Sequence, residues 1–462
     1  MQAWVKAELA SVDLGDARRQ ARVVKLLDQL SRNPQGTFNQ ACPTAADKKA
    51  AYRFFANARV APEPILEAHF ACTWERIEQA TGRMLVVQDT TSLDYSAHHR
   101  AQGLGPLDKK ECQGLFVHTA LALSEAGEPL GLVHQELWAR EAAALGQSER
   151  RRERVWQAKE SYKWQRTVER VLARAPQEQS FVIIGDRESD VYGLLASPRP
   201  AGVELLVRSA QNRTVQEAEG LLHAALASGP AAGQVIVEVA RGKERTPRAA
   251  ICEVRYRALT LLPPRRADKG VPQVSVRVWA VAIRELHPPN GDTPLQWVLL
   301  ATWPIESLAA AIQCATYYSR RWLVERYHFV LKSGCRIEAA QLRDRARLER
   351  LEAVYTIIAW QLLALTYQAR LRPEQPCEPM LRREEWVVLY AHSHQKLPPA
   401  EESPPTIAQA VDWVAKLGGY WGRKSDAPPG VKVLWRGLQR LQGMVEGFTL
   451  AAAIFQQEQR SG

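Results

Sequence analysis

Two aspartates follow apolar, strand-like runs of the chain. Asp89 ends the segment M-L-V-V-Q-D at 84–89, and Asp186 follows the run F-V-I-I-G at 181–185. In open α/β sheets, functional side chains gather at strand ends, where the backbone stops and side chains converge. A single Asp at such a point is more often a turn residue or a helix N-cap. Two of them in one sheet favour a shared chemical site.

A third carboxylate lies in the helical segment 318–332. At 100° per residue, a continuous helix places Tyr318, Arg321, Glu325 and Lys332 on one face. The opposite face is apolar and is expected to pack on the core: Leu323, Tyr327, Val330 and Leu331. A surface stripe of ion pairs would have the same spacing, so the spacing alone only suggests a site.

Together these side chains have the chemistry of metal-dependent phosphoryl transfer. Asp89, Asp186 and Glu325 could hold two Mg²⁺ or Mn²⁺ ions, because such ions prefer oxygen ligands. Two metals ~4 Å apart activate a water or a 3′-hydroxyl and stabilise the leaving oxygen. Arg321 and Lys332 would bind the phosphates that flank the reacting bond. No G-x-S-x-G motif and no P-loop is present in the sequence.

Composition narrows the class of partner. The 462 residues carry 61 Lys and Arg against 50 Asp and Glu, a formal charge of +11 that favours a polyanion such as nucleic acid. No apolar run approaches the ~20 residues of a membrane span, and the N-terminus lacks the apolar core of a signal peptide. The seven scattered cysteines suit reduced thiols. We therefore expect a cytoplasmic protein with no membrane partner.

The order of the expected elements indicates the fold class. Strands at 84–89, 116–123 and 129–140 precede a charged helical stretch at 148–175, which leads to a strand at 181–185, a short helix and a strand at 204–208. This order predicts a ribonuclease H-like α/β core, a mixed sheet flanked by helices. Residues 210–300 read as a β-rich insertion, with strands at 234–239, 249–256, 274–283 and 297–302, before a long helix that begins near 307.

Both ends of the chain are expected to be helical. The N-terminal helices at 14–30 and 45–55 are basic, with Arg18, Arg22 and Lys25 on the first and Lys49 and Arg53 on the second. A solvated basic face is the alternative, but two such helices favour a DNA-binding module.

After about residue 370, a Pro-rich stretch leads into the C-terminal helices. Within 431–453, apolar residues recur at helical spacing: Leu434, Leu438, Leu441 and Val445. A subunit interface and a buried core helix are equally compatible with this stripe. We expect three domains: an N-terminal helical domain at 1–65, a catalytic domain at 66–370 and a C-terminal helical domain at 371–462.

The chain resembles the bacterial cut-and-paste transposases of the transposon-five (insertion-sequence-four) type, which carry a DDE motif. The Y-x-x-R-x-x-x-E-x-x-x-x-x-x-K pattern of Tyr318, Arg321, Glu325 and Lys332 matches the signature of that family. Further similar motifs run from near residue 4 to near 455: L-G-D-A-R-R at 14–19, A-Y-R-F-F at 51–55, Q-D-T-T-S-L at 88–93, G-L-V-H-Q-E at 131–136, G-D-R-E-S-D at 185–190, P-L-Q-W-V-L-L at 294–300 and L-G-G-Y at 417–420.

The resemblance implies roles for individual residues. Asp89, Asp186 and Glu325 correspond to the catalytic, metal-binding triad. Arg208 corresponds to a DNA-contacting arginine near the active site, and Trp297 to a tryptophan that interacts with a base displaced from the duplex. The expected DNA-contacting residues are therefore Tyr318, Arg321, Lys332, Trp297, Arg208, Arg18, Arg22 and Arg53.

Two features depart from the family pattern. Arg326 replaces an acidic residue that often follows the catalytic Glu, and the basic stretch E-R-R-R-E-R at 149–154 lies in a variable connector. Neither touches the triad, although both could change the affinity for DNA.

The sequence therefore predicts a transposase that binds double-stranded DNA at the terminal inverted repeats of its element. It would excise the element by metal-dependent nicking and hairpin formation and join the 3′-hydroxyl ends to target DNA. The resemblance implies a homodimer in the synaptic complex, closed through the C-terminal helices, and a bacterial, nucleoid-associated location. One alternative is a catalytically silent DNA-binding regulator derived from a transposase. Another is a ribonuclease H-like nuclease that cuts without joining.

Overall fold

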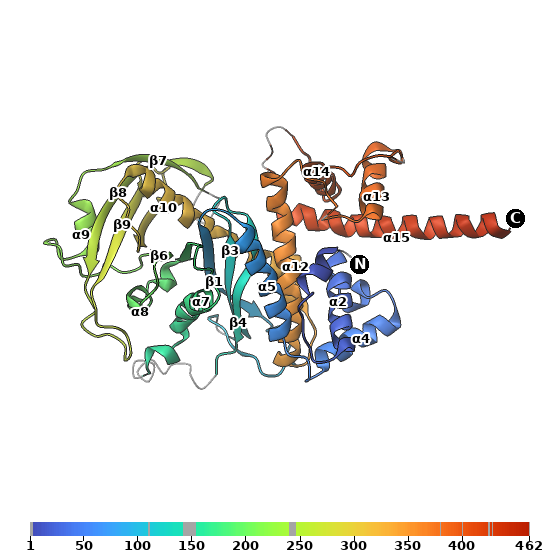
Figure 1. The fold of residues 1–462 in the computed structure, drawn as a ribbon, viewed down its shortest axis with the longest axis horizontal. Helices are drawn as coiled ribbons and strands as arrows, with labels where there is room; N and C mark the ends of the chain where they lie inside the picture. The colour runs from blue at the N-terminus through green and yellow to red at the C-terminus, as the bar shows by residue number, and fades with distance from the viewer. Residues whose placement is uncertain are drawn as a thin grey trace.

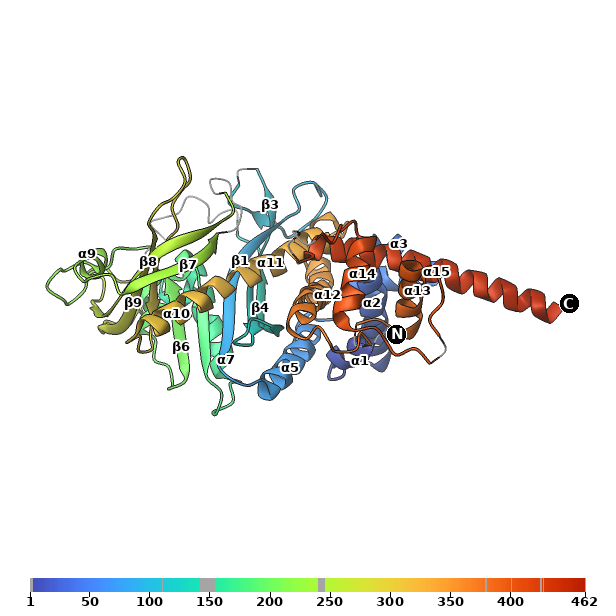
Figure 2. The same cartoon turned by 90° about the horizontal axis from the view of Figure 1, so that it is seen from above.

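The computed structural model describes residues 3–109, 111–141, 154–239, 246–378, 380–399, 401–423, 426 and 428–461. The stretch 149–153, most of the basic connector singled out above, lies outside these residues. The molecule is elongated, with a large sheet at one end, helical regions at the other, and a last helix that projects away from the body (Figures 1 and 2).

A run of helices begins the chain: α1 (Ala3–Glu8), α2 (Ala17–Arg32), α3 (Phe38–Ala41), α4 (Ala45–Ala56) and α5 (Glu63–Gln79). The L-G-D-A-R-R motif forms the start of α2. Gly15 has a φ of +65°, and Asp16 caps the helix by accepting from the backbone N–H of Arg18 at 2.7 Å. The Arg19 guanidinium donates to the carbonyl oxygens of Leu14 and Arg59. This motif therefore holds the module together locally.

The core strands follow one another along the chain as the sequence predicted, and they form one sheet. The core strands are β1 (Met84–Asp94), β3 (Gln113–Leu123), β4 (Pro129–Trp138), β5 (Phe181–Gly185) and β6 (Val203–Arg208), and they lie side by side in the order β4-β3-β1-β5-β6. β1, β5 and β6 are parallel, whereas β3 is antiparallel to both β1 and β4. This mixed arrangement confirms the ribonuclease H-like α/β core. The short strand β2 (Gly105–Pro106) pairs with β3.

The β-rich insertion extends the same sheet. Its strands are β7 (Gly233–Val239), β8 (Arg248–Leu261), β9 (Val276–Glu285) and β10 (Gln296–Ala301), all joined by antiparallel pairing. β10 pairs with β6, so the insertion continues the core in one ten-stranded sheet. This continuity fixes Trp297 of β10 relative to the core strands.

Two apolar clusters lie on the two faces of this sheet. On β1, Leu85 and Val87 belong to the cluster shared with the long helix α12 (Arg345–Leu371), while Met84 and Val86 belong to the cluster shared with α7 (Lys163–Leu172). This alternation follows from the period of two in a strand. Short helices connect the strands between β4 and β7: η2 (Trp156–Ala158), η3 (Glu160–Tyr162), η4 (Arg187–Ser189), α8 (Tyr192–Ala196) and α9 (Leu222–Ala227).

The segment predicted as one helix around residues 318–332 is broken, which corrects the helical-wheel prediction. α10 (Leu308–Arg320) stops at Arg321, where the Arg321 N–H bonds to the carbonyl of Tyr318, three residues back. α11 (Trp322–Phe329) follows, and then a π-helical turn, η5 (Val330–Gly334), and η6 (Ile337–Ala339). In the π turn, the Cys335 N–H bonds to the carbonyl of Val330, five residues back. The regular spacing of 3.6 residues per helical turn therefore does not extend to Lys332.

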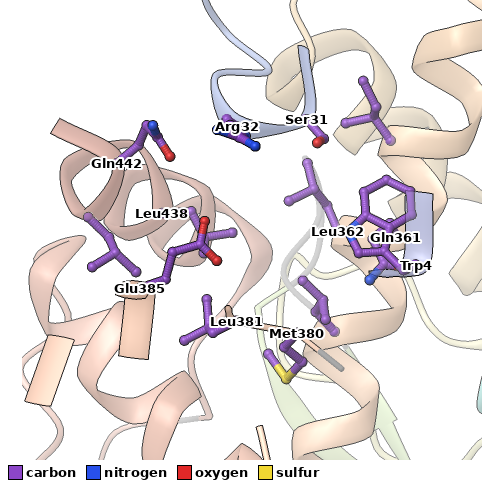
Figure 3. A pocket seen from close by; sticks show the side chains of 13 residues that line it. Trp4, Ser31, Arg32, Gln361, Leu362, Met380, Leu381, Glu385, Leu438 and Gln442 are labelled. Atoms are coloured by element: carbon purple, nitrogen blue, oxygen red, sulfur yellow. The ribbon is translucent and has the colours of Figure 1, made fainter. Parts of the chain in front are cut away.

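The C-terminal region contains α13 (Arg383–His394), α14 (Ile407–Leu417) and α15 (Val431–Ser461). Figure 3 shows where this region meets α12 and the N-terminal helices, around a cavity of about 50 Å³. Trp4 and Arg32 line it from the N-terminal side, Leu362 from α12, and Met380 and Leu438 from the C-terminal side. The two ends of the chain therefore pack together.

Candidate active site

The three carboxylates predicted from the sequence lie on three different elements. Asp186 directly follows β5 and caps η4 by accepting from the Glu188 N–H at 2.8 Å. Glu325 lies on α11. Asp89 lies inside β1, which corrects the prediction that its strand ends there. The parallel pairing with β5 stops at Val87, but the antiparallel pairing with β3 continues, and Asp89 lies opposite Thr119.

The guanidinium of Arg321 bridges two of these carboxylates. It forms an ion pair with Glu325, one helical turn further along the chain, and its Nη1 lies 3.8 Å from Oδ2 of Asp89. Arg321 is itself largely buried. Burial opposes the charge of Arg321, but Tyr318, Glu325 and Asp89 together raise its already high pKa. Arg321 therefore places positive charge between Asp89 and Glu325.

Asp89 has a perturbed pKa. Burial is the largest cause and raises the pKa to about 7, even though Arg321 lowers it. The negative charges of Asp186 and Glu325 contribute to this rise. The charges of Asp186 and Glu325 therefore both act on Asp89, and they disfavour its ionised form.

The chemistry of this donor set fits a divalent cation. Carboxylate oxygens are the ligands that Mg²⁺ and Mn²⁺ prefer, and a cation would favour the ionised form of Asp89. Within the described part of the chain, however, no three His, Cys, Asp or Glu side chains are grouped as ligands of a metal ion. In this structure Arg321 supplies the neutralising charge at Asp89 and Glu325 instead.

Two aromatic residues predicted to contact DNA meet beside this centre. The rings of Trp297 and Tyr318 are 5.1 Å apart and nearly perpendicular, and the Arg321 guanidinium lies 6.0 Å from the Tyr318 ring. Tyr318 is only 4% exposed, so it mainly supports Trp297. Trp297 also lines a hollow of about 240 Å³ together with Arg255, Arg284 and His223. The sequence did not single out these last three residues, because they are far from Trp297 along the chain.

Lys332 and Arg208 occupy different positions around the centre. The π turn places Lys332 at the end of β1, where its Nζ donates to the carbonyl of Ser92 at 2.8 Å and lies 3.2 Å from Glu338. Arg208 ends β6 and donates to the carbonyl of Gln296 at 3.0 Å. Since β5 and β6 pair as far as Gly185 and Val207, Arg208 and Asp186 leave the same edge of the sheet.

The expected basic surface of the N-terminal helices is smaller than the sequence suggested. Lys25 and Arg22 of α2 form ion pairs with Asp47 of α4, at 2.6 and 3.4 Å. These two charges therefore join the helices to each other. Arg18, Lys49 and Arg53 are exposed. Their side chains are therefore available to contact a bound polyanion.

The apolar stripe predicted on the last helix packs within its own chain. Leu434, Leu441 and Val445 are at most 5% exposed and form a core with α13 and α14, and Leu438 packs against it. The stripe is thus a core feature. Exposed apolar side chains occur further along the same helix, where it projects from the body (Figure 2): Phe448, Leu450, Ile454 and Phe455.

Family models match three stretches of the chain. A transposase DNA-binding model matches residues 1–60, a transposase DDE domain model matches residues 137–361, and a Tn5 transposase dimerisation domain model matches residues 357–457. The chain belongs to the DDE transposases of the Tn5 type. The DDE match includes Asp186 and Glu325 of this transposase and begins after Asp89.

Among solved structures, the transposase is similar to the piggyBac transposase in a cryo-EM structure of its synaptic complex with hairpin DNA. The two share 9% identity with a TM-score of 0.38, over 80% of this chain and 73% of the other. The family to which this transposase belongs cleaves DNA, transfers strands and generally uses divalent metal ions. No helix in the described residues of the transposase combines the length and apolar character of a membrane span.

One residue beside the carboxylates was missed by the sequence analysis. His328 is buried on α11, and its Nδ1 lies 4.0 Å from Oδ2 of Asp89. Burial lowers the pKa of His328 to about 3, so its ring is neutral at physiological pH. The sequence did contain a signal for this residue: His328 comes three residues after Glu325, so a helix places both side chains on nearly the same face.

Proposed function

We propose that this transposase excises its element by metal-dependent nicking and hairpin formation and joins the freed 3′-hydroxyl ends to target DNA. Asp89, Asp186 and Glu325 would be its catalytic and metal-binding residues. The observation that carries the proposal is the convergence of three elements on one centre: Arg321 pairs with both Asp89 and Glu325, and burial, with the charges of Asp186 and Glu325 added, raises the pKa of Asp89 to about 7. Such an arrangement is typical of sites built to hold charge.

The chain's own residues would bind and orient the DNA around this centre. Mg²⁺ or Mn²⁺, two ions per site, would activate the attacking oxygen and stabilise the leaving oxygen when bound to the triad. Arg321 would exchange its carboxylate partners for a backbone phosphate, and Lys332 would bind a second phosphate. Trp297, backed by Tyr318, would hold a base displaced from the bent hairpin end, with Arg208 beside it.

The two helical ends would supply DNA recognition and assembly. Residues 1–65 would bind the terminal repeats through exposed cations such as Arg18 and Arg53, whereas Arg22 would act within the module. Residues 371–462 would close the homodimer, and the projecting apolar end of α15 would be the contact surface, because a helix pays a cost in exposing side chains such as Phe455 and Leu450 unless another chain covers them. Residues 66–370 would form the catalytic domain.

Amide substitutions test the triad. Asp89→Asn, Asp186→Asn and Glu325→Gln keep the side-chain volume but remove a ligating charge, so we expect end binding to persist while nicking, hairpin formation and strand transfer are lost. Asp94→Asn is the matched control, because Asp94 lies on the same strand as Asp89 and outside the triad. A triad variant that nicks at the wild-type rate in Mg²⁺ would remove that residue from the proposal, and full activity in excess chelator would exclude the metal mechanism.

The alternative function, a catalytically silent DNA-binding regulator, predicts a different result. A regulator would bind the element ends through residues 1–65 but would nick none of them, with or without Mg²⁺ or Mn²⁺. The presence of three coupled carboxylates favours the enzyme.

A further inference from the structure

Three polar side chains lie in a row across the sheet beneath α11. Asp89 of β1 is the register partner of Thr119 of β3, and Thr119 is the register partner of Gln135 of β4. Directly paired residues present their side chains on the same face of a sheet. Thr119 is fully buried and Gln135 is 7% exposed, so two members of this polar row, Asp89–Thr119–Gln135, lie inside the core.

One side chain of α11 forms a hydrogen bond with Thr119, and another forms one with Gln135. Nε2 of His328 lies 3.1 Å from Oγ1 of Thr119, and the hydroxyl of Tyr327 donates to Oε1 of Gln135 at 3.3 Å. Two consecutive residues of the helix are thus anchored to two neighbouring strands.

Hydrogen bonds to the helix α12 fix the orientation of the Gln135 side chain. Its amide nitrogen donates to the carboxyl of Glu352 and to Oγ1 of Thr356, both on α12, the latter at 3.0 Å. With the nitrogen held there, the amide oxygen is directed toward Tyr327. This gives a function to Gln135 of the G-L-V-H-Q-E motif, which the proposed chemistry does not use.

The backbone hydrogen-bond pattern is irregular at both ends of α11, so side-chain anchors add to what fixes the rotation of this helix. It is only eight residues long, preceded by the break at Arg321 and followed by the π turn that begins at Val330. Apolar contacts are not directional and tolerate rotation and sliding of a short helix, whereas hydrogen bonds restrict both. A small rotation of α11 would move Glu325 and Arg321 away from Asp89.

We propose that Thr119 and Gln135 are positioning residues, which set the rotation of α11 through His328 and Tyr327 and so bring Glu325 to Asp89. This inference rests on the proposed function of Glu325. The two residues do not touch DNA or the reacting atoms, and they act only through the helix that carries the catalytic carboxylate.

A matched pair of substitutions tests the role of Thr119. Thr119→Val and Thr167→Val are isosteric, and each removes one hydroxyl that pairs with a buried histidine. Thr167 lies on α7 and pairs with His118 at 3.2 Å on the opposite face of the sheet, away from α11. Both variants should lose similar thermal stability and keep wild-type end binding. Only Thr119→Val should slow single-turnover nicking at saturating DNA, by at least about tenfold, because small misplacements of catalytic groups are costly.

Two further variants separate positioning from stability. Thr119→Ser restores the hydroxyl and should recover most of the nicking rate. Tyr327→Phe should reproduce the nicking defect, whereas Tyr95→Phe should not, since the buried Tyr95 hydroxyl has no hydrogen-bond partner in the described structure. Equal nicking losses in Thr119→Val and Thr167→Val, or no rescue by Thr119→Ser, would overturn the proposal.

The outcome is distinguishable from failure of the proposed function. If Glu325→Gln nicks normally, the catalytic assignment of Glu325 is wrong, and a defect in Thr119→Val could not then arise from displacing it. If Glu325→Gln abolishes nicking while Thr119→Val and Thr167→Val behave alike, the triad stands and only the positioning role fails.

Discussion

Replacing Asp89 by Asn should stabilise the DNA-free protein at alkaline pH. The folded protein raises the pKa of Asp89 to about 7 from an ordinary value of 3.8, chiefly by burial and also through the charges of Asp186 and Glu325. Between these two pH values the folded chain retains a proton that the unfolded chain releases. The stability that protonated Asp89 contributes is therefore complete below about pH 4 and is lost as the pH rises through 7.

The size of the effect follows from the two pKa values. A difference of about 3 pH units at ~1.36 kcal/mol each gives about 4 kcal/mol as the cost of an ionised Asp89 in the folded protein. Asn has the shape of the neutral acid and never carries that charge. Asp89→Asn should thus gain about 4 kcal/mol over the wild type at pH 8 and almost nothing at pH 4. For a cooperative unit of ~300 residues, with an unfolding entropy of ~2 cal/mol/K per residue, this is an increase of about 7 °C in Tm.

Thermal unfolding from pH 4 to pH 9, in chelator and without DNA, measures this difference. Asp94→Asn is the control on the same strand. Hydrogen bonds from Ser96 lower the pKa of Asp94, so its contribution is present above its unfolded pKa and is lost as the pH falls. The control should therefore lose stability at neutral pH, opposite in sign to Asp89→Asn. An Asp89→Asn variant no more stable than the wild type at pH 8, or a gain that does not shrink toward pH 4, would refute the burial of Asp89 among like charges.

Three further predictions concern DNA contact and assembly. Trp297→Ala should slow hairpin formation at least about fivefold more than first-strand nicking, because stacking on an unpaired base is worth ~1–3 kcal/mol; a time course that resolves the two products measures both rates. Lys49→Gln and Arg53→Gln should each weaken end binding and reduce the slope of log affinity against log salt by about 1, as measured by gel shift. Leu450→Glu and Phe455→Glu should abolish paired-end complexes on native gels with little change in Tm, because both side chains are exposed in the single chain.

Each of these has a control and a contrary outcome. Trp297→Phe keeps an aromatic face and should retain hairpin formation; equal loss of both steps, with a lower Tm, would make Trp297 a packing residue. Arg22→Gln should lower the stability of the N-terminal module, through its pairing with Asp47, and leave the salt slope unchanged. Leu441→Ala, in the core, should cost about 2–5 kcal/mol of stability. Paired-end complexes that survive the Glu substitutions would exclude the end of α15 as the interface.

Local patterns in the sequence were sufficient to predict the core strands and the residue types of the site. Apolar runs located the strands of the core, because a strand buried on both faces needs several consecutive apolar residues. The strand and helix order then led to the ribonuclease H-like sheet, and the pairing of β1 with β3 and β5 confirms it. The roles of Asp89, Asp186 and Glu325 remain predictions, although the structure brings their charges into one electrostatic environment.

Only the tertiary structure determined which residues meet when they are far apart in the sequence. The wheel for 318–332 assumed one continuous helix, but the break at Arg321 and the π turn send Lys332 to Ser92, because backbone hydrogen bonds shift there from four residues to three and five. Lys25 is bound to Asp47, a pairing across two helices that no local period contains. The stripe on α15 is amphipathic whether its partner is its own chain or another, so its spacing could not distinguish a core from an interface. Register across β1, β3 and β4 likewise depends on long-range packing, and it alone places Asp89, Thr119 and Gln135 in one row.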